Sequence, residues 1–191
     1  MTKSELRKIY LERRRSIPAD AHSAFSREIV DRLFNEIDIN SISSIHCYLS
    51  LEHVGEVETG ILFDRVWNDF PHIITTAPKI DALNLGMDSV IYQRDTPTNE
   101  DRWKIPEPSG SEIIAPEALD LVVVPLLCFD LRGHRAGYGK GFYDRFLAKC
   151  RPECVKAGLS FFPPIDFIDD VHEADVPLDL CLTPSGAFRF H

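Results

Sequence analysis

The feature that most constrains the fold lies in residues 120–147, which read DLVVVPLLCFDLRGHRAGYGKGFYDRFL. Residues 121–124 form an unbroken aliphatic run, which is typical of a strand buried on both faces. A connector leads to the glycine-rich segment 133–141, and residues 142–147 follow with the apolar spacing of a helix. A strand, a glycine-rich turn and a helix in this order predict an α/β fold with an anion-binding turn.

The composition of the turn indicates which anion it binds. Gly137, Gly139 and Gly141 alternate with larger residues, so the backbone can bend through positive φ and bring its N–H groups against a ligand. Lys140 and Arg135 supply full positive charges. A phosphate group is therefore the predicted ligand, and a flexible turn without a ligand is the alternative.

Asp144 falls in the first turn of the predicted helix, where its carboxylate can hold a divalent cation bound to the phosphate. Two other phosphate motifs are excluded by their spacing. A P-loop requires Gly-x4-Gly-Lys-Ser/Thr, but five residues separate Gly133 from Gly139 here, and a glycine follows Lys140. The dinucleotide motif requires G-x-G-x-x-G, whereas this turn reads G-x-G-x-G.

Residues 133–147 resemble the signature of the 5-formyltetrahydrofolate cyclo-ligase family, also called methenyltetrahydrofolate synthetases, whose usual form is close to G-x-R-L-G-x-G-x-G-Y-Y-D-x-x-L. The chain departs from this form at Ala136 for the common Leu, at Phe142 for Tyr, and at Tyr138, where many members carry Arg. The departure at Tyr138 removes a positive charge from the turn. Phosphate binding would then depend more on the remaining cations.

A second segment of resemblance lies on a helix that a capping box at its start predicts over residues 2–16. The predicted buried stripe of this helix is Leu6, Ile9, Tyr10 and Ile17. Lys3, Arg7 and Arg14 fall close together on the helical wheel, beside this apolar stripe and not opposite it. Lys3 and Arg7 match the family's N-terminal K-x-x-x-R, which contacts the nucleotide. Ordinary solvated basic residues are the alternative.

The folate site is implied by the resemblance of two loops. Glu56 matches the first Glu of the family's E-I-E-T segment, and a carboxylate complements the adjacent N–H donors of a pterin. Trp103, in a long loop over residues 95–116, resembles the family's W-x-I-P segment and would stack on the folate or pack beneath the loop. The substrate site is assigned to Leu49, Glu56, Trp103, Tyr138 and Phe142.

The metal site and the nucleotide site also follow from the resemblance. The family pairs a carboxylate near its last strand with the one after the glycine-rich turn, so Asp144 and Asp179 are the predicted magnesium ligands, with Asp175 as a nearby competitor. Lys140, Arg135 and Tyr143 are the predicted catalytic residues. The nucleotide site is assigned to Lys3, Arg7, Arg135, Gly137, Tyr138, Gly139, Lys140, Gly141, Phe142 and Tyr143.

Composition limits the remaining possibilities. A length of 191 residues and a hydrophobic fraction of 44% predict a single globular domain over residues 1–191. A net charge of −9 argues against a nucleic-acid partner or an anionic membrane. The N-terminus has no apolar core of a signal peptide, and no apolar run approaches a membrane span, so we expect a soluble, cytoplasmic protein. A monomer is a separate expectation, because the sequence does not reveal the oligomeric state. Five scattered cysteines predict reduced thiols.

Helices are predicted over residues 2–16, 19–36, 59–70 and 142–147, and strands over 45–49, 72–77, 121–124, 155–161 and 176–183. This alternation predicts a three-layer α/β/α domain with a mostly parallel sheet, the architecture of phosphosugar isomerases and CoA transferases. The resemblance implies ATP- and Mg²⁺-dependent cyclisation of 5-formyltetrahydrofolate. A phosphosugar isomerase-like enzyme and a non-catalytic nucleotide- or folate-binding module are the alternatives.

Overall fold

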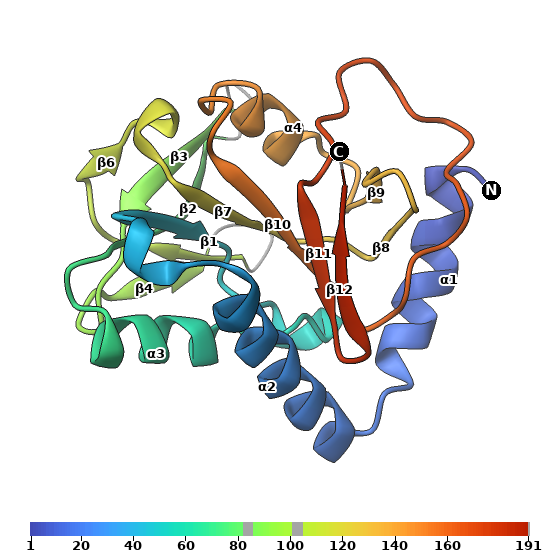
Figure 1. The fold of residues 1–191 in the computed structure, drawn as a ribbon, viewed down its shortest axis with the longest axis horizontal. Helices are drawn as coiled ribbons and strands as arrows, with labels where there is room; N and C mark the ends of the chain where they lie inside the picture. Colours follow the sequence, from blue (N-terminus) through green and yellow to red (C-terminus); the bar gives the residue numbers. More distant parts are fainter. Residues whose placement is uncertain (82–85, 101–104, 191) are drawn as a thin grey trace.

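The computed structural model describes residues 1–81, 86–100 and 105–190, and its central element is an eight-stranded sheet (Figure 1). The strand order is β12-β11-β10-β7-β1-β2-β3-β6, and β2, β1, β7, β10 and β11 run parallel to one another. The predicted mostly parallel sheet is therefore confirmed. The strands are β1 (Ser44–Cys47), β2 (Ile74–Asp81), β3 (Gly86–Ile91), β6 (Ile113–Ile114), β7 (Leu121–Val124), β10 (Val155–Leu159), β11 (Leu180–Thr183) and β12 (Gly186–Arg189).

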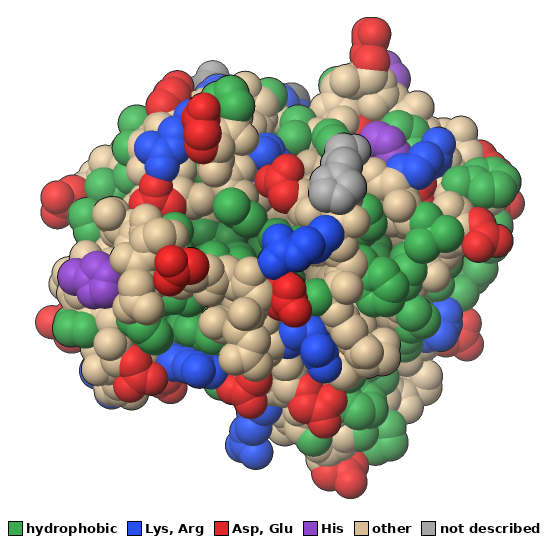
Figure 2. All heavy atoms as spheres, viewed as in Figure 1, with side chains coloured by type: hydrophobic (Ala, Val, Ile, Leu, Met, Phe, Trp, Pro, Cys, Tyr) green, Lys and Arg blue, Asp and Glu red, His purple; other side chains and the backbone are tan. Residues whose placement is uncertain are grey.

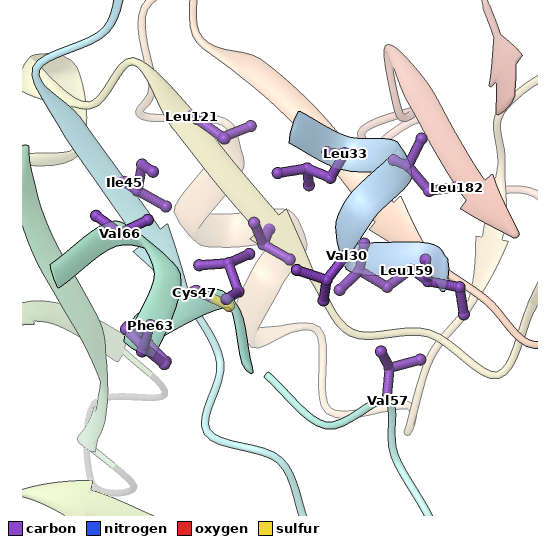
Figure 3. Packing of buried hydrophobic residues seen from close by; sticks show 14 of the residues in the cluster. Val30, Leu33, Ile45, Cys47, Val57, Phe63, Val66, Leu121, Leu159 and Leu182 are labelled. Carbon is purple, nitrogen blue, oxygen red and sulfur yellow. The ribbon is translucent and has the colours of Figure 1, made fainter. Parts of the chain in front are cut away.

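Helices cover both faces of the sheet. The α-helices are α1 (Lys3–Arg15), α2 (Ala19–Glu36), α3 (Gly60–Asp69) and α4 (Phe142–Leu147), and short 3-10 helices occupy η1 (Ile39–Ser41), η2 (Glu52–Val54) and η3 (Pro116–Ala118). In the core on one face, Val30 and Leu33 of α2 and Phe63 of α3 pack against the strands (Figure 3). On the other face, Phe146 of α4 belongs to a second buried cluster. The order helix, sheet, helix gives the predicted three layers.

Strand β7 shows why its sequence has no polar alternation. Leu121 and Val123 belong to the cluster under α2 and α3, whereas Val122 and Val124 belong to the cluster under α4. All four side chains are fully buried. A strand in the middle of a parallel sheet is covered on both faces, so alternate residues meet different helices and both sets must be apolar.

Helix α1 begins with the predicted capping box, in which the Thr2 side chain accepts from the Glu5 backbone N–H and the Glu5 side chain accepts from the Thr2 backbone. Leu6 and Tyr10 are buried as expected, but the predicted stripe was wrong at Ile9, which is 39% exposed. The buried position is instead filled by Arg14. A cation therefore enters the interior from a helix whose other basic residues lie closer to the surface.

A hairpin of β8 (Cys128–Phe129) and β9 (Arg135–Ala136) stands between β7 and the glycine-rich turn, where the sequence predicted a plain connector. Helix α1 packs against this hairpin. Because Arg135 belongs to β9, its backbone is fixed in a strand and its side chain is buried. The turn proper begins only after Ala136.

Three further differences concern the region from residue 72 to residue 116. Strand β2 continues through Pro78, where the sequence predicted its end, because its pairing with β1 stops at Thr76 and beyond that point the observed ladder joins it to β3. Pro at such a one-sided position removes no essential hydrogen bond. The predicted loop contains β4 (Thr98–Glu100) paired with β5 (Pro106–Pro108), and β6 extends the main sheet.

Within the described residues, no helix combines the length and apolarity that crossing a membrane requires. Acidic and basic side chains alternate over the face shown in Figure 2, and they do not gather into one basic patch on that face. This distribution agrees with the net charge of −9.

Candidate functional site

A cavity of about 480 Å³ lies at the carboxyl end of the parallel strands. Its wall includes Tyr48, which follows β1, and Pro125, which follows β7, together with Pro78 and Ile80 near the end of β2. The first turns of α1 and the glycine-rich turn complete it. Open α/β sheets bind ligands at this edge, and the volume lies in the range of small-molecule sites.

Two of the three glycines in the turn have the backbone that requires glycine. Gly139 has φ +86° and Gly141 has φ +66°, whereas Gly137 lacks a positive φ, so the predicted role of three such glycines was wrong at Gly137. A Cβ at Gly139 would lie 3.0 Å from Cζ of Arg7. Arg7 also donates from Nε to the Gly137 carbonyl at 2.7 Å. The turn is therefore packed directly against the guanidinium of α1.

The cations predicted to bind phosphate differ in how they are held. Lys3 forms an ion pair with Asp175, and Arg135 donates from Nη2 to Oδ1 of Asp144 at 2.7 Å. Arg135 also donates to the Val176 carbonyl at 2.5 Å. In contrast, the exposed side chain of Lys140 makes no ion pair with any described residue.

Burial and charge oppose each other at these ion pairs. Burial lowers the pKa of the Arg135 guanidinium, and the negative charges of Asp144 and Asp175 act in the opposite direction. For Asp175, burial raises the pKa, but the hydrogen bond from Lys3, the hydrogen bond from the His172 backbone and nearby positive charge outweigh it and hold the pKa below its usual value. Asp175 is therefore an anion beside Lys3 and Arg135.

The structure does not bring the two predicted metal ligands together. Asp144 lines the cavity, but Asp179 precedes β11 and lies at the amino end of a parallel strand, whereas the cavity lies at the carboxyl ends. Asp179 instead accepts from the Lys156 backbone N–H at 2.7 Å and pairs with the Lys156 ammonium at 3.2 Å. Asp175 lines the cavity together with Asp144, and Glu56 is a further carboxylate of the wall. The geometry therefore does not support Asp179 as the partner of Asp144, and Asp175, the competitor named from the sequence, is the aspartate that lies in the cavity wall with it.

The residues predicted for substrate binding converge from three segments. Leu49, Glu56, Tyr138 and Phe142 all line the cavity, and Trp103 lies outside the described residues. Glu56 is 5% exposed and accepts from the Tyr138 hydroxyl at 2.5 Å and from the Leu51 backbone N–H at 2.8 Å. Burial raises its pKa, and these two hydrogen bonds with the charge of Arg14 offset part of that rise.

Tyr143 also lines the cavity, and its hydroxyl is buried without a hydrogen-bond partner among the described residues. Burial holds its pKa well above the usual value for tyrosine. The side chain is therefore a neutral donor. A buried hydroxyl without a partner is stabilised when a ligand atom accepts a hydrogen bond from it.

The sequence pattern singled out Arg14 but gave it no role, and the structure places it against Tyr138 of the cavity wall, although Arg14 does not line the cavity itself. Arg14 is 4% exposed, and it donates to the Tyr138 hydroxyl at 2.9 Å and to the Leu126 carbonyl. Its position on the helical wheel, beside the apolar stripe, indicates that the side chain can be buried. That position does not identify the hydrogen-bond partners of the guanidinium. The apolar wall residues Pro78 and Ile80 carried no signal, because only the β2–β3 pairing brings them to the cavity.

Comparison with known proteins gives consistent results. The model of the 5-formyltetrahydrofolate cyclo-ligase family matches residues 1–184. The 5-formyltetrahydrofolate cyclo-ligase of Escherichia coli is 25% identical over 192 residues, covering 94% of this chain and 98% of the relative. The Haemophilus influenzae protein of the same name is 28% identical over 166 residues, covering 83% of each chain.

Solved structures show the same similarity. The solution structure of Aquifex aeolicus 5,10-methenyltetrahydrofolate synthetase matches with a TM-score of 0.85 at 26% identity, covering 100% of this chain and 94% of that one. A methenyltetrahydrofolate synthetase from Mycoplasma pneumoniae matches with a TM-score of 0.76 at 24% identity, covering 95% and 98%, and shows the fold alone.

Proposed function

Because this chain belongs to the 5-formyltetrahydrofolate cyclo-ligase family, we propose that it uses ATP and Mg²⁺ to convert 5-formyltetrahydrofolate into 5,10-methenyltetrahydrofolate, ADP and phosphate. The family assignment makes the protein a ligase of one-carbon folate metabolism. ATP, the metal and the mechanism are parts of the proposal. So are a single domain, a monomer and a cytoplasmic location.

One observation carries the proposal: a single cavity combines a positively charged glycine-rich turn with a buried carboxylate. Lys140 and Arg7 lie at the turn, and Glu56 lies in the same wall. The turn suits a polyphosphate, because backbone N–H groups and cations meet there. The carboxylate suits the adjacent N–H donors of a pterin. An enzyme that joins a nucleotide reaction to a folate needs both features next to each other.

The proposed chemistry explains why the site needs no protein nucleophile. The formamide oxygen of the substrate is a poor leaving group, so it first attacks the γ-phosphorus of ATP; an O–P bond forms and the bond to ADP breaks. The neighbouring folate nitrogen then attacks the formyl carbon, its proton passes to solvent, and the C–O bond breaks to release phosphate. Such a transfer depends on positioning and on charge neutralisation.

The residues in the wall fit these tasks. Lys140 lines the cavity and makes no ion pair with any described residue, so it is available to neutralise phosphate oxygens. Arg7 is held over the turn by its hydrogen bond to Gly137 and would contact the same phosphates. The unpartnered hydroxyl of Tyr143 would donate to the formyl oxygen and orient it. These assignments keep Lys140 and Tyr143 next to the transferred group.

Asp144 and Asp175 fit a magnesium ion. No described group of three or more His, Cys, Asp or Glu side chains could hold a metal alone. Mg²⁺ is usually held by one or two carboxylates, with phosphate oxygens and water completing its shell, so two carboxylates in the cavity wall suffice. When bound, the ion supplies neutralisation of the phosphate charge. Its protein ligands would be Asp144 and Asp175.

These two carboxylates are also the partners of Arg135 and Lys3. Asp144 and Asp175 would hold the metal ion with the same carboxylates that pair with Arg135 and Lys3. Arg135 and Lys3 would then be free to meet phosphate oxygens. We infer that the metal and the nucleotide bind cooperatively. The metal would stabilise the two carboxylates when the phosphates take over Arg135 and Lys3, and the phosphates would stabilise these two cations when the metal takes over the carboxylates.

The proposal is tested by mixing the protein with 5-formyltetrahydrofolate, ATP and Mg²⁺ and recording the absorbance of the methenyl product. Omission of ATP or of Mg²⁺ should each abolish the signal. Formation of the product without ATP would contradict the phosphorylation step. Tight folate binding without release of ADP would instead identify a binding module.

A further inference from the structure

A chain of hydrogen bonds connects the interior of α1 to the cavity wall through Arg14, Tyr138 and Glu56. The Arg14 Nη1 donates to the Tyr138 hydroxyl at 2.9 Å, and that hydroxyl donates to Oε1 of Glu56 at 2.5 Å. The three residues come from α1, from the glycine-rich turn and from the loop after β1. The tyrosine therefore joins its own turn to two segments that lie 124 and 82 residues away in the sequence.

Both ends of this chain are charged and buried. Arg14 is 4% exposed and Glu56 is 5% exposed, whereas Tyr138 is 37% exposed in the cavity wall. Buried charges are tolerated when they are paired and hydrogen-bonded. The hydroxyl of Tyr138 gives each of them one hydrogen bond, because it accepts from the cation and donates to the anion, whereas Nε of Arg14 has no partner among the described residues. Tyr138 thus does more than remove a cation from the turn.

Arg14 is fixed by contacts other than the tyrosine. Its Nη2 donates to the Leu126 carbonyl, and its Cγ would lie 3.4 Å from a Cβ at Gly55. Gly55 has φ +63° and directly precedes Glu56. The aliphatic part of Arg14 therefore packs under the loop that carries the carboxylate. Arg14 therefore contacts both this loop and the hydroxyl that faces Glu56.

The carboxylate of Glu56 keeps acceptor capacity for a ligand. A carboxylate has about four acceptor positions on its two oxygens. Tyr138 uses one on Oε1, and the Leu51 backbone N–H uses one on Oε2. Because Glu56 lines the cavity, the remaining positions suit a group that presents adjacent N–H donors.

We propose that Arg14 and Tyr138 are positioning residues that hold Glu56 in place to recognise the adjacent N–H donors of the substrate's pterin ring. The inference rests on the proposed function, which supplies the pterin. It adds a specific role for two residues whose side-chain hydrogen bonds join them to each other, to Glu56 and to the Leu126 carbonyl.

The charge of Glu56 depends on every group that faces it. Burial raises its pKa, and the hydrogen bonds from Tyr138 and from the Leu51 backbone lower it, as do the charges of Arg14 and His53. Three further titratable groups lie close enough for the charge of Glu56 to raise their pKa, namely Cys47, Tyr48 and Tyr143. Loss of the Tyr138 hydroxyl should raise the pKa of Glu56 further. A protonated Glu56 presents fewer acceptors, so substrate binding should then weaken at a higher pH than in the wild type.

The test compares Tyr138→Phe with Tyr92→Phe, which removes a hydroxyl from a tyrosine that packs on Phe63 and Trp67 outside the cavity wall. Two quantities are measured for each protein. The first is the pKa of the Glu56 carboxyl in the ligand-free protein, followed by NMR. The second is the Kd for 5-formyltetrahydrofolate without nucleotide, as a function of pH.

For Tyr138→Phe we expect a higher Glu56 pKa and a Kd that is larger by roughly fivefold to tenfold near neutral pH, with little change for Tyr92→Phe. Arg14→Met should have the same two effects, and Arg14→Lys should restore part of both because it keeps the charge. Thermal unfolding of each variant shows whether it is folded. A folded Tyr138→Phe with an unchanged Glu56 pKa would overturn the inference.

A changed Glu56 pKa with an unchanged Kd at every pH would also overturn it, because the hydrogen bonds would then be structural only. Failure of the proposed function gives a different result: wild-type protein would bind no 5-formyltetrahydrofolate. In that case the role in pterin recognition falls as well, although the Glu56 pKa still responds to Tyr138.

Discussion

Arg135 and Asp144 form an ion pair beside the glycine-rich turn, with Nη2 of the arginine 2.7 Å from Oδ1 of the aspartate. The sequence predicted both residues as ligand contacts, one for phosphate and one for magnesium. In the structure each serves as the counter-ion of the other, and the Arg135 side chain is only 6% exposed. The Asp144 side chain is 29% exposed, so a cation bound there would share the carboxylate with Arg135 or displace it and exchange the partner of the guanidinium.

Asp144→Asn tests this exchange. The variant loses a metal ligand and frees the Arg135 guanidinium from its anion, so Mg²⁺ should no longer strengthen ATP binding, while ATP binding without Mg²⁺ should become tighter by severalfold. Turnover should fall by at least about tenfold. Calorimetric titration of ATP in the presence and absence of Mg²⁺ measures the coupling directly.

The matched control for this prediction is Asp179→Asn, which makes the same change outside the described cavity wall. It should leave the coupling between Mg²⁺ and ATP intact. If Asp179→Asn abolishes the coupling and Asp144→Asn does not, the assignment of the metal carboxylates is wrong.

The choice between Asp175 and Asp179 shows where sequence reasoning reaches its limit. The central strand was predictable, because residues 121–124 are all aliphatic and nothing else in the chain competes with that pattern. The two aspartates are only four residues apart in the segment DVPLD. Which of them reaches the cavity depends on where β11 starts, and the polar segment before Leu180 carries no periodic signal that fixes it.

Arg14 illustrates a second limit. Its angle on the helical wheel placed it beside Lys3 and Arg7, and all three do face the interior side of α1. The partners of its guanidinium, Tyr138 and the Leu126 carbonyl, are more than a hundred residues away in sequence. Only the docking of α1 on the β8–β9 hairpin creates those contacts. The capping box at Thr2, by contrast, is local and was predictable from four consecutive residues.

Lys140→Ala should retain the fold and lose activity. The side chain is exposed and has no ion pair among the described residues, so its removal breaks no contact that stabilises the folded state. A charge-assisted contact to phosphate is worth about 1.5–3 kcal/mol, so turnover should fall by roughly tenfold or more. Steady-state rates and the melting temperature check both parts, with the exposed Lys149→Ala as control. Normal turnover in Lys140→Ala would remove this residue from the mechanism.

Gly139→Ala should weaken nucleotide binding because the turn cannot accept a side chain there. Its φ of +86° is strained for alanine, and the added Cβ would lie 3.0 Å from Cζ of Arg7. We expect a loss of about 1–2 kcal/mol in the free energy of unfolding and a larger Kd for ATP. Gly137→Ala is the matched control, because Gly137 lacks a positive φ and the nearest atom to its added Cβ is 3.9 Å away. Equal effects of the two variants would refute the role of the Gly139 conformation.

His46 should make the protein less stable in acid. It is fully buried, its Nδ1 lies 2.9 Å from the Ser89 hydroxyl, and burial lowers its pKa from 6.5 to about 3. Between pH 6.5 and about pH 3, His46 binds a proton in the unfolded chain but stays neutral in the folded protein. Stability from this residue is thus fully present above pH 6.5 and is lost as the pH falls toward 3.

In that window each unit of pH should lower the free energy of unfolding by up to about 1.4 kcal/mol through His46 alone. Urea unfolding at a series of pH values measures the slope. His46→Asn removes the titrating ring from a site that still offers the Ser89 hydroxyl as a partner, so the variant should show a shallower slope than the wild type. His72→Asn at an exposed position is the control and should keep the wild-type slope. An unchanged slope in His46→Asn would contradict the prediction. The acid sensitivity would then arise from other groups, and the His46 ring of the folded wild type would be protonated or exposed to solvent.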